Sequence, residues 1–464
     1  QHIKKGFSLI NYDYKFPTLT NVAYNYFNTY KPSYNKYKNK GRFAVINVND
    51  PRYSDRCNPL HPDLLGTKAN AMDAVSTIFF NLDKKSATKQ DFFQMSAISI
   101  TSAALWFLKM YEDGKYCSFP HLIEFLQQPD EQILKIMASY DELIYFTSSF
   151  TDALEKEAYD QLSGQTASAR IPLGKCATDE MFYVMTDPDN TGVNLRVNLP
   201  DEVTVLNIAN NPETQQTNAP ALGLYMSQAA KLINAHGRVP CNFHVDELPT
   251  IFINGLNNLI ATARSNKVCV TLSAQDYSQL VMNYGKEIAD TIFNTIDNIF
   301  SGKVAIETAE KITKSIGKIN YANKSVSMSE SNSETISTQR EYAVPAEDIT
   351  QLSQGEFVGI VSDNFKQPID LKIFRGLVSP SKDDLGDLEY SIINPEITPE
   401  ILAKNTQNIR KQIKTIIKKE MKRLEKQKQK QMEEAEEEMT NEFEFNSPAI
   451  SFEPEVDLDK NDNM

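Results

Sequence analysis

The sequence predicts an α/β fold, in which a parallel β-sheet covered by helices is interrupted by an all-helical block and followed by a charged tail. Three observations lead to this prediction. Short apolar runs rich in β-branched residues alternate with amphipathic segments, as in a parallel sheet that is buried on both faces. Residues 64–173 lack such runs, and apolar residues recur there at helical spacing. The last part of the chain is rich in Lys and Glu and poor in aliphatic residues, so it cannot bury a core.

Six apolar runs are expected to form the strands of the sheet. They cover residues 7–12, 43–48, 203–208, 241–245, 268–273 and 299–305. Between the second and third runs, the long helical block is followed by two further short apolar segments, at 181–185 and 193–198. The turn residues Asp, Pro, Asn and Gly at 187–192 separate these two segments, which predicts a β-hairpin.

The C-terminal part of the sequence changes character twice. A polar segment at 320–341 predicts a mobile or hairpin loop, and two strands are expected after it, at 356–361 and 369–374. The packed part is expected to end near Gly376. Residues 398–441 run from Lys-rich into Glu-rich sequence, which favours a long solvated helix with a disordered acidic end.

Composition excludes several classes of protein. The 464 residues carry a formal net charge of −13, which argues against a surface covered with nucleic-acid-binding cations, so any DNA contact must be local. The five cysteines are scattered singly, without a Cys-x-x-Cys pair, which favours neither a zinc site nor a disulfide framework. No stretch approaches the roughly 20 apolar residues that span a bilayer, and no signal peptide opens the sequence.

An apolar strand that ends in two adjacent carboxylates is the strongest local signal. The run at 241–245 leads directly into Asp246 and Glu247. Because successive side chains diverge at a strand tip, Asp246 can hold Mg²⁺ through water while Glu247 faces the position of an attacking water. This arrangement suits hydrolysis of a phosphoanhydride. The alternative is a strand that happens to end in a charged turn, which is the commoner case for a lone match of this kind.

Two more polar residues are placed to act with this acidic pair. The strand at 268–273 delivers Gln275 to the carboxyl edge of the sheet, where an amide can orient water and sense a terminal phosphate. Arg264 follows the helix between the two strands and lies at the end of the sheet opposite the strand tips. It would therefore serve the site of a neighbouring subunit better than the site of its own. The alternatives are that Gln275 is a polar residue at a helix start and that Arg264 caps a helix C-terminus.

The order and spacing of these motifs resemble the TraG/TraD family of type IV secretion system coupling proteins, and in particular the TraG/MobC-like branch of Bacteroides-type mobile elements. The resemblance covers roughly residues 5–376. It is carried by Val-Asp-Glu-Leu-Pro at 245–249, Ala-Arg-Ser-Asn at 263–266, Ser-Ala-Gln-Asp at 273–276, and by residues 11–15, 58–60, 283–285, 308–317 and 355–360.

This resemblance implies a RecA-like P-loop NTPase core, an all-α domain inserted after the second strand, a hexameric ring and an N-terminal membrane anchor. Asp246 would be the magnesium-associated Walker B aspartate and Glu247 the general base. Gln275 would sense the nucleotide, and Arg264 would be the arginine finger that reaches across the subunit interface. The implied cofactors are ATP and Mg²⁺.

One departure from the family is large. No Gly-x-x-x-x-Gly-Lys-Ser/Thr loop occurs in the sequence, so the backbone amides and the lysine that cradle phosphates are missing. In the family, this loop precedes the strand that here contains Asp13, and by the same resemblance Asp13 and Lys15 are expected to contact the nucleotide. We therefore expect an N-terminally truncated sequence that binds nucleotide poorly and hydrolyses nothing measurable, from a parent protein that is an ATPase.

The resemblance also suggests how the chain is divided. Residues 1–63 are expected to form the first part of the RecA-like nucleotide-binding domain, 64–173 the all-α domain and 174–380 the rest of the nucleotide-binding domain. Residues 381–464 are expected to form a charged helical and disordered tail, which either recruits partners or keeps the protein soluble.

The function that this resemblance implies is that of a conjugative coupling ATPase. Such a protein would bring a relaxase bound to single-stranded DNA to a type IV secretion channel, at the cytoplasmic face of the bacterial inner membrane, and would use ATP to move the DNA. Two alternatives stay open: a nucleotide-free docking protein of a mobilisation apparatus, and a double-stranded DNA pump of the chromosome-segregation kind. The inserted helical domain and the Asn-Pro-Leu motif at 58–60 speak against the pump.

Overall fold

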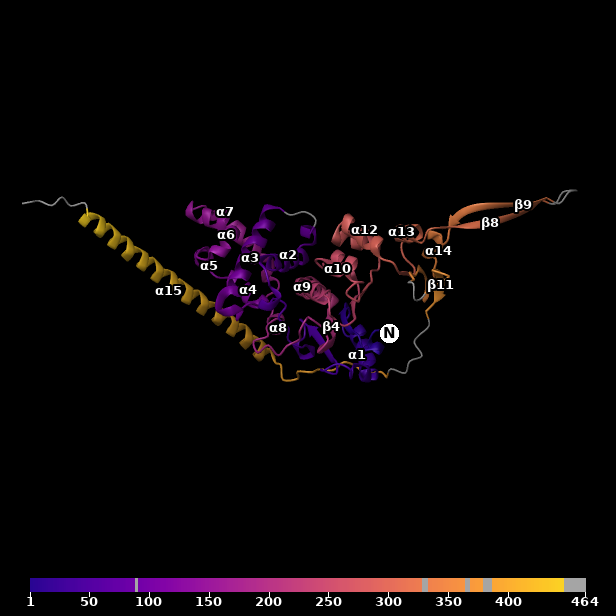
Figure 1. The fold of residues 1–464 in the computed structure, drawn as a ribbon, viewed down its shortest axis with the longest axis horizontal. Coiled ribbons are helices and arrows are strands. Elements are labelled where there is room, and N and C mark those ends of the chain that lie inside the picture. Colours follow the sequence, from indigo (N-terminus) through magenta and orange to yellow (C-terminus); the bar gives the residue numbers. More distant parts are fainter. Residues whose placement is uncertain (88–90, 328–332, 364–367, 379–385, 446–464) are drawn as a thin grey trace, which may run out of the picture. The chain divides into compact units, whose positions relative to one another are not determined.

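The computed structural model describes residues 1–87, 91–327, 333–363, 368–378 and 386–445 (Figure 1). The chain forms two compact units, Gln1–Ile413 and Lys414–Met464. The acidic end of the sequence, for which disorder is expected, lies outside the described residues.

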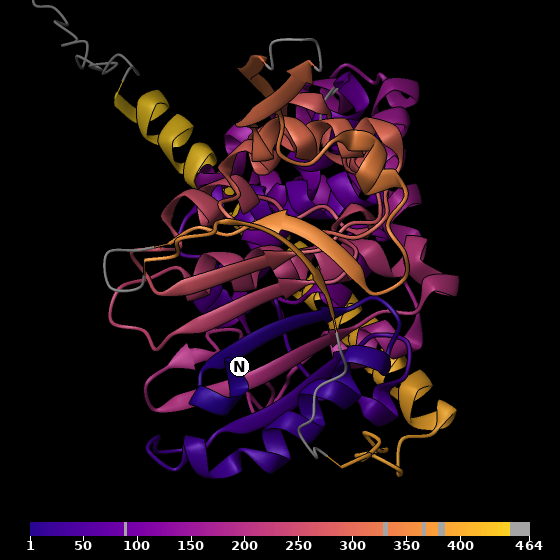
Figure 2. The same cartoon turned by 90° about the vertical axis from the view of Figure 1, so that its right-hand side faces the viewer.

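A parallel sheet forms the centre of the first unit (Figure 2). Its strand order is β2-β4-β1-β5-β6, and every neighbouring pair in this order is parallel. The predicted α/β fold with a parallel sheet is therefore confirmed, and five of the six expected runs form it. The strands are β1 (Ser8–Asp13), β2 (Arg42–Asn47), β4 (Glu202–Ala209), β5 (Cys241–Val245) and β6 (Val268–Leu272), with the short β3 (Asn198–Leu199) antiparallel to β4.

Helices cover both faces of this sheet. The crossovers from β1 to β2 and from β4 to β5 run in opposite directions, so right-handed connections place α1 (Thr18–Thr29) and α9 (Gln215–Ile233) on opposite faces. On the α1 side, Leu9, Phe27 and Val205 belong to one core cluster. On the other side, α9 is buried along most of its length.

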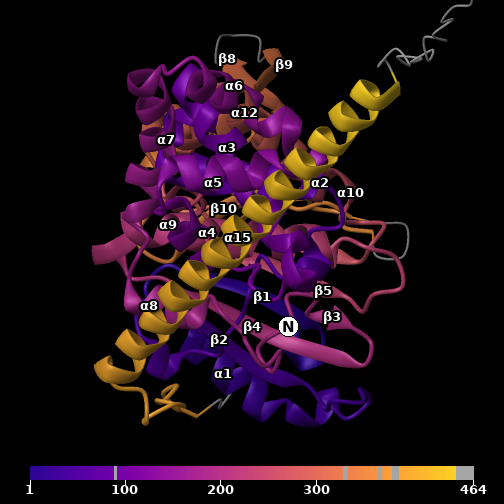
Figure 3. The ribbon, with the colours of Figure 1, turned by 90° about the vertical axis from the view of Figure 1, so that its left-hand side faces the viewer.

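Between residues 64 and 173 the described part of the chain contains helices and no strand (Figure 3). The first of them begins at a capping box, in which Asn70 donates its backbone N–H to Thr67 and accepts one from it. As domain boundaries, residues 64 and 173 stay predictions. The helices are α2 (Lys68–Leu82), α3 (Phe92–Met110), α4 (Phe119–Leu126), α5 (Asp130–Ala138), α6 (Ile144–Glu155) and α7 (Tyr159–Gly174).

The β-hairpin predicted around the turn at 187–192 is wrong. The segment before the turn is the helix α8 (Asp179–Val184), and of the segment after it only the residues of β3 pair with a neighbour. Thr178 caps α8 by accepting the backbone N–H of Met181 at 3.2 Å, and Asp179 and Glu180 add negative charge to its first turn. These helix-start signals outweigh the strand propensity of the residues that follow.

The sixth expected strand belongs to a second sheet, so its predicted place in the parallel sheet is wrong. The run at 299–305 contributes only β7 (Ile299–Ser301), which pairs antiparallel with β10 (Glu356–Ile360) and not with the parallel sheet. β11 (Ile373–Leu377) pairs with the other edge of β10, so the strand expected at 369–374 begins later. Ile312, Ile349 and Val358 share a separate core cluster, which holds this second sheet against its own helices.

A long antiparallel hairpin precedes β10. It is formed by β8 (Lys318–Ser327) and β9 (Ser333–Tyr342), in the place where the sequence predicts a mobile or hairpin loop. The turn of the hairpin lies outside the described residues. The helices around this region are α10 (Leu256–Thr262), α11 (Tyr277–Tyr284), α12 (Lys286–Thr295), α13 (Ile306–Ile316) and α14 (Ala346–Thr350).

The packed part continues well beyond Gly376, which corrects the expected start of the tail. Residues 388–413, here called the C-terminal strap, lie against elements from the beginning of the chain. Tyr390 joins an aromatic cluster with ring centroids 5.5 Å from Tyr24 and 5.6 Å from Phe43. The Asn25 side chain donates to the Leu388 carbonyl at 2.8 Å and accepts its N–H at 2.9 Å. The sequence does not predict this packing, because the apolar residues of the strap are spaced too widely to give a periodic signal.

The end of the strap contacts the helical block. Arg410 pairs with Glu124 at 3.0 Å, and Gln412 Oε1 lies 2.9 Å from His121 Nε2, while Ser118 lies 2.7 Å from the other ring nitrogen. Burial lowers the pKa of His121 to about 4, and the hydrogen bond to Gln412 acts in the opposite direction. His121 is therefore neutral in the folded protein at neutral pH.

This burial predicts a loss of stability in acid. The pKa of an unfolded histidine is near 6.5, so neutral His121 makes its full contribution to the free energy of unfolding above that pH. This contribution falls by roughly 3 kcal/mol as the pH falls toward about 4. In urea unfolding between pH 7 and pH 4, His121→Gln is expected to remove this part of the pH dependence. The exposed His236 provides the control, because His236→Gln should leave the wild-type pH dependence. Equal pH dependence of wild type and His121→Gln would contradict the assignment.

The described residues of the second unit continue the helix α15 (Pro399–Phe445), as the sequence predicts for 398–441. Ion pairs run along it, from Arg423 to Glu420 at 2.8 Å and from Lys430 to Glu434 at 3.2 Å. In the described part of the chain, every helix is too short or too polar to cross a bilayer.

Candidate functional site

The acidic pair lies at the carboxyl end of β5, in a tightly determined turn. The Asp246 N–H donates to the Tyr12 carbonyl at 3.2 Å, which continues the pairing with β1. Glu247 has a φ of 57°, in the left-handed region that residues other than glycine rarely adopt, and its side chain is buried. Its carbonyl accepts from the Thr250 N–H at 3.0 Å and from the Thr250 hydroxyl at 2.7 Å. Strained backbone of this kind is concentrated at functional sites.

Gln275 meets this turn from the neighbouring strand. The exits of β5 and β6 are joined by two backbone hydrogen bonds, from Ser273 N to Val245 O at 2.9 Å and from Leu248 N to Ser273 O at 2.8 Å. The Gln275 backbone N–H then lies 3.5 Å from Glu247 Oε1, and its side chain is exposed. The structure therefore brings the acidic pair and the amide to one edge of the sheet.

Arg264 lies at the other end of β6. It is exposed, in the turn between α10 and the first residue of the strand, and its carbonyl accepts the N–H of Lys267. The length of β6, about 16 Å at 3.3 Å per residue, separates this turn from the exit that carries Gln275. The turn that contains Arg264 therefore lies at the opposite end of β6 from the acidic pair of the same chain.

Asp13 lies at the end of β1 and contacts the helix that follows it. Its carboxylate is fully buried at the end of β1, and Oδ2 accepts from the backbone N–H and the hydroxyl of Thr20, each at 2.8 Å. Burial raises the pKa of Asp13, the hydrogen bonds from Thr20 lower it, and the nearby charge of Asp246 raises it. The side chain fastens α1 to the sheet. Lys15 is exposed in the following turn, and for both residues a nucleotide contact stays a prediction.

A buried polar layer supports the strand exits, and sequence reasoning missed it. The Tyr12 hydroxyl lies 2.9 Å from the Thr250 hydroxyl and accepts from Asn210 Nδ2 at 3.0 Å, so it ties β1, β4 and the turn after β5 together. Burial raises the pKa of Tyr12 well above its usual value. The available signal was the polar residue that ends each apolar run, Tyr12 in the first and Asn210 after the third.

A polar cavity of about 310 Å³ opens at the exits of β2 and β4. Sequence reasoning also missed this cavity, because its walls come from three loops that are distant in sequence. One of its lining residues, Asn210, donates to the Tyr12 hydroxyl, which lies 2.9 Å from the Thr250 hydroxyl. It is lined by Phe16, Asn47, Asn49, Asp50, Tyr53, Asn210, Asn211 and Glu213.

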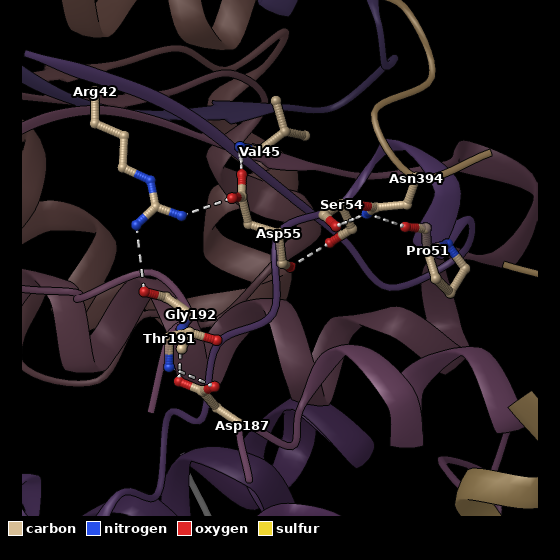
Figure 4. Close-up of polar contacts among 9 residues, drawn as sticks. All are labelled: Arg42, Val45, Pro51, Ser54, Asp55, Asp187, Thr191, Gly192 and Asn394. Carbon is tan, nitrogen blue, oxygen red and sulfur yellow. Dashed lines mark hydrogen bonds and ion pairs between the residues drawn. The ribbon is translucent and has the colours of Figure 1, made fainter. Parts of the chain in front are cut away.

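The loop after β2, which forms one wall of this cavity, is fixed by a network of polar contacts (Figure 4). Asp55 accepts from Arg42 at 2.7 Å and from the Val45 N–H at 3.1 Å. Asn394 of the C-terminal strap donates to the carbonyls of Pro51 at 3.2 Å and Ser54 at 2.8 Å. The strap therefore holds the loop from outside the sheet.

The donor set fits a magnesium nucleotide in part. Mg²⁺ in such sites is held by one or two carboxylates together with phosphate oxygens and water, and Asp246 is a partly exposed carboxylate at the correct sheet edge. Among the described residues, no group of three or more His, Cys, Asp or Glu could hold a metal ion without such additional ligands. The phosphate-binding loop is not among residues 1–464.

Comparison with known proteins agrees with this architecture. Residues 240–354 match the protein family described as the TraM recognition site of TraD and TraG. None of the curated proteins matches the chain. The solved structures that are similar include the bacterial conjugative coupling protein TrwBdeltaN70 in an unbound form, with a TM-score of 0.58 and 15% identity over 82% of this chain and 79% of that chain.

Two further structures of the plasmid coupling protein TrwB contain nucleotides. The complex with the ATP analogue ADPNP has a TM-score of 0.58 and 14% identity over 85% of this chain and 82% of that chain. The complex with ADP and Mg²⁺ has a TM-score of 0.54 and 14% identity over 85% of this chain and 88% of that chain. At such identities the similarity shows the fold alone, a RecA-like parallel sheet covered by helices. With the family match at 240–354, it confirms the resemblance to TraG/TraD-family coupling proteins.

Proposed function

We propose, from this resemblance to the TraG/TraD-family coupling proteins, that the chain is the motor part of an ATPase that moves DNA during conjugation. The observation that carries the proposal is the meeting of Glu247 and Gln275 at the carboxyl edge of a RecA-like sheet, 3.5 Å apart between carboxylate oxygen and backbone nitrogen. Ligands of open α/β sheets bind at this edge. TrwB, whose fold is similar, binds ADPNP in one solved complex and ADP with Mg²⁺ in another.

Each residue of the site has a defined part in the proposed hydrolysis. Glu247 accepts a proton from the attacking water, and its buried, left-handed backbone holds the carboxylate in one position. Asp246, which is more open to solvent, would hold a magnesium ion, and that ion would neutralise negative charge on the phosphates. The exposed side chain of Gln275 contacts the terminal phosphate and reports its loss.

The phosphate-binding loop is proposed to come from residues outside 1–464. The open edge of β6 supports this proposal, because β5 is the one described strand that pairs with β6, and Cys269 and Thr271 of β6 are exposed. A further parallel strand paired with β6 would end beside Gln275. A loop that follows such a strand would supply backbone N–H groups to the phosphates at the point where the acidic pair lies.

The proposed partners follow from the same family. They are a relaxase bound to single-stranded DNA, the components of a type IV secretion channel and further copies of this chain in a hexameric ring. The proposed location is the cytoplasmic face of the bacterial inner membrane, through an anchor outside residues 1–464. The family description of residues 240–354 as a TraM recognition site supports a partner in the DNA-processing complex.

The ring arrangement is tested by mixing two inactive variants of the protein that carries its phosphate-binding loop. Rings of Arg264→Ala alone, and rings of Glu247→Gln alone, are expected to hydrolyse ATP at least ~100-fold more slowly than wild type. In an equimolar mixture, subunits with an intact Glu247 meet neighbours with an intact Arg264, so about a quarter of the wild-type turnover should return. Turnover that stays absent in mixed rings would refute the role of Arg264 across the interface. No ATP hydrolysis by the wild-type protein would favour the docking function.

A further inference from the structure

The first 42 residues differ in charge from the rest of the chain. They contain seven lysines and Arg42 against one acidic residue, Asp13, in a chain whose formal net charge is −13. The carboxylate of Asp13 is fully buried against α1. A strong local excess of positive charge in an acidic protein indicates a polyanionic partner at this place.

The fold gathers most of these lysines on one surface. Residues 3–5 lie against residues 31–40, because Ser33 donates to the Lys4 carbonyl at 2.8 Å and Lys36 donates to the Lys5 carbonyl at 3.0 Å. The Tyr34 hydroxyl donates to the Phe7 carbonyl at 2.9 Å in the same contact. We call this the lysine surface, and it consists of Lys4, Lys5, Lys31, Lys36, Lys38 and Lys40.

Four lysines of the lysine surface have no carboxylate partner in the described part of the chain. Among the residues that the structure describes, no ion pair joins Lys5, Lys36, Lys38 or Lys40 to a carboxylate, and all four are exposed. Lys31 donates to the Gly41 carbonyl at 2.9 Å, and its partial burial lowers its pKa. Positive charge left in this way is available to a partner.

An apolar and aromatic stripe borders the lysines. Val22, Tyr26 and Tyr30 follow one another at helical spacing along α1 and its end, and half of the Val22 side chain is exposed. The rings of Tyr26 and Tyr30 are stacked with centroids 6.2 Å apart, and the Lys4 ammonium lies 5.8 Å and 5.1 Å from them. Tyrosine, aliphatic side chains and lysines with extended stems are the composition of protein surfaces at a membrane–water interface.

We propose that the lysine surface rests on the headgroups of an anionic phospholipid bilayer, with Val22 and Tyr26 at the level of the headgroups. This inference goes beyond the proposed ATPase function and does not depend on it. Clusters of four to eight basic residues bind anionic lipid, and each contributes separately to the attraction.

Three observations favour lipid over nucleic acid as the partner. The exposed cations are all lysines, whereas Arg42, the arginine in this part of the sequence, donates to Asp55 and to the Gly192 carbonyl. The partly exposed rings that could stack on bases, Tyr26 and Tyr30, have the Lys4 ammonium 5.8 Å and 5.1 Å from their centroids. Val22 has no role in contacts to a phosphodiester backbone.

The proposed contact also has a defined orientation. Residues 3–5 come immediately before β1, and residues 31–40 come immediately before β2, so the lysine surface lies at the amino end of the sheet. The candidate site lies at the carboxyl end. A bilayer at the lysine surface therefore leaves the acidic pair facing away from the lipid.

The test measures binding of the 464-residue chain to vesicles by co-sedimentation. Vesicles of phosphatidylcholine with about 30% phosphatidylglycerol should bind the chain, vesicles of pure phosphatidylcholine should not, and about 0.5 M salt should abolish binding. The triple variant Lys36→Glu, Lys38→Glu, Lys40→Glu should bind about 100-fold more weakly. The matched control changes three exposed lysines elsewhere, Lys156→Glu, Lys175→Glu and Lys303→Glu, and should bind as well as wild type.

Thermal unfolding monitored by circular dichroism establishes that both triple variants are folded, because all six positions are exposed. Equal vesicle binding by wild type and the Lys36/Lys38/Lys40 variant would overturn the proposal, and so would an equal loss in both triple variants. A parallel titration with fluorescent single-stranded and duplex oligonucleotides covers the competing partner. Loss of oligonucleotide binding in the Lys36/Lys38/Lys40 variant, without binding of the wild type to anionic vesicles, would identify a nucleic-acid surface and refute the lipid contact.

Discussion

The Glu247→Gln variant of the protein that carries its phosphate-binding loop is expected to bind ATP with wild-type affinity and to lose turnover by at least ~100-fold. A general base contributes about 10²–10⁴-fold to the rate of a reaction, and glutamine keeps the shape of glutamate without its ability to take a proton. The Gln275 N–H can still donate to the carbonyl oxygen of Gln at this position, so the turn should persist. Fluorescent nucleotide titration measures binding, and release of inorganic phosphate measures turnover.

Two further variants separate the general base from a general effect of charge. Glu287→Gln removes an exposed carboxylate on α12 and should keep wild-type turnover. Asp246→Asn should weaken magnesium-dependent nucleotide binding as well as turnover, because it removes the proposed metal ligand. If Glu247→Gln hydrolyses ATP as fast as Glu287→Gln, the assignment of Glu247 as the general base is wrong.

Loss of the Tyr390 ring is expected to destabilise the first unit by about 3 kcal/mol, within the range measured for truncation of buried aromatic side chains. Tyr390 is 8% exposed and packs against Phe16, Tyr24 and Phe43 from two segments at the beginning of the chain. Tyr390→Ala would leave a cavity between α1 and β2. Urea unfolding followed by circular dichroism gives the change in the free energy of unfolding.

The matched control is Tyr145→Ala, because Tyr145 is 92% exposed and should change stability by less than about 0.5 kcal/mol. Tyr390→Phe keeps the ring and should cost under about 1 kcal/mol. Equal stability of Tyr390→Ala and Tyr145→Ala would mean that the strap does not contribute to the stability of the unit.

The central sheet and the meeting of Glu247 with Gln275 could be predicted from sequence because both depend on local pattern. A buried parallel strand appears in the sequence as a nearly continuous apolar run, as at 241–245. Once two such strands are neighbours and parallel, the residues that follow them must share one edge. The structure adds the left-handed turn at Glu247, which no spacing of residues announces.

The features that sequence reasoning missed depend on contacts between distant segments. The hydrogen bonds from Thr20 on the next helix to Asp13 Oδ2 could not be read from the sequence, and a nucleotide contact of Asp13 stays a prediction. The run at 299–305 resembles the other apolar runs at its start, and only the pairing of β7 with β10 places it in a second sheet. Tyr390 lies between polar residues in the sequence, and its burial results from packing against the aromatic residues of α1 and β2.

The C-terminal strap also has a consequence for how the protein is made. During synthesis, α1 and β2 leave the ribosome long before the residues around Tyr390. The aromatic side chains of Tyr24 and Phe43 therefore stay exposed until Tyr390 has been synthesised. Domains synthesised first usually fold first, and apolar surface left open during that time promotes association with other chains. In this protein the outer edge of the sheet can close only after the residues around Tyr390 have been synthesised.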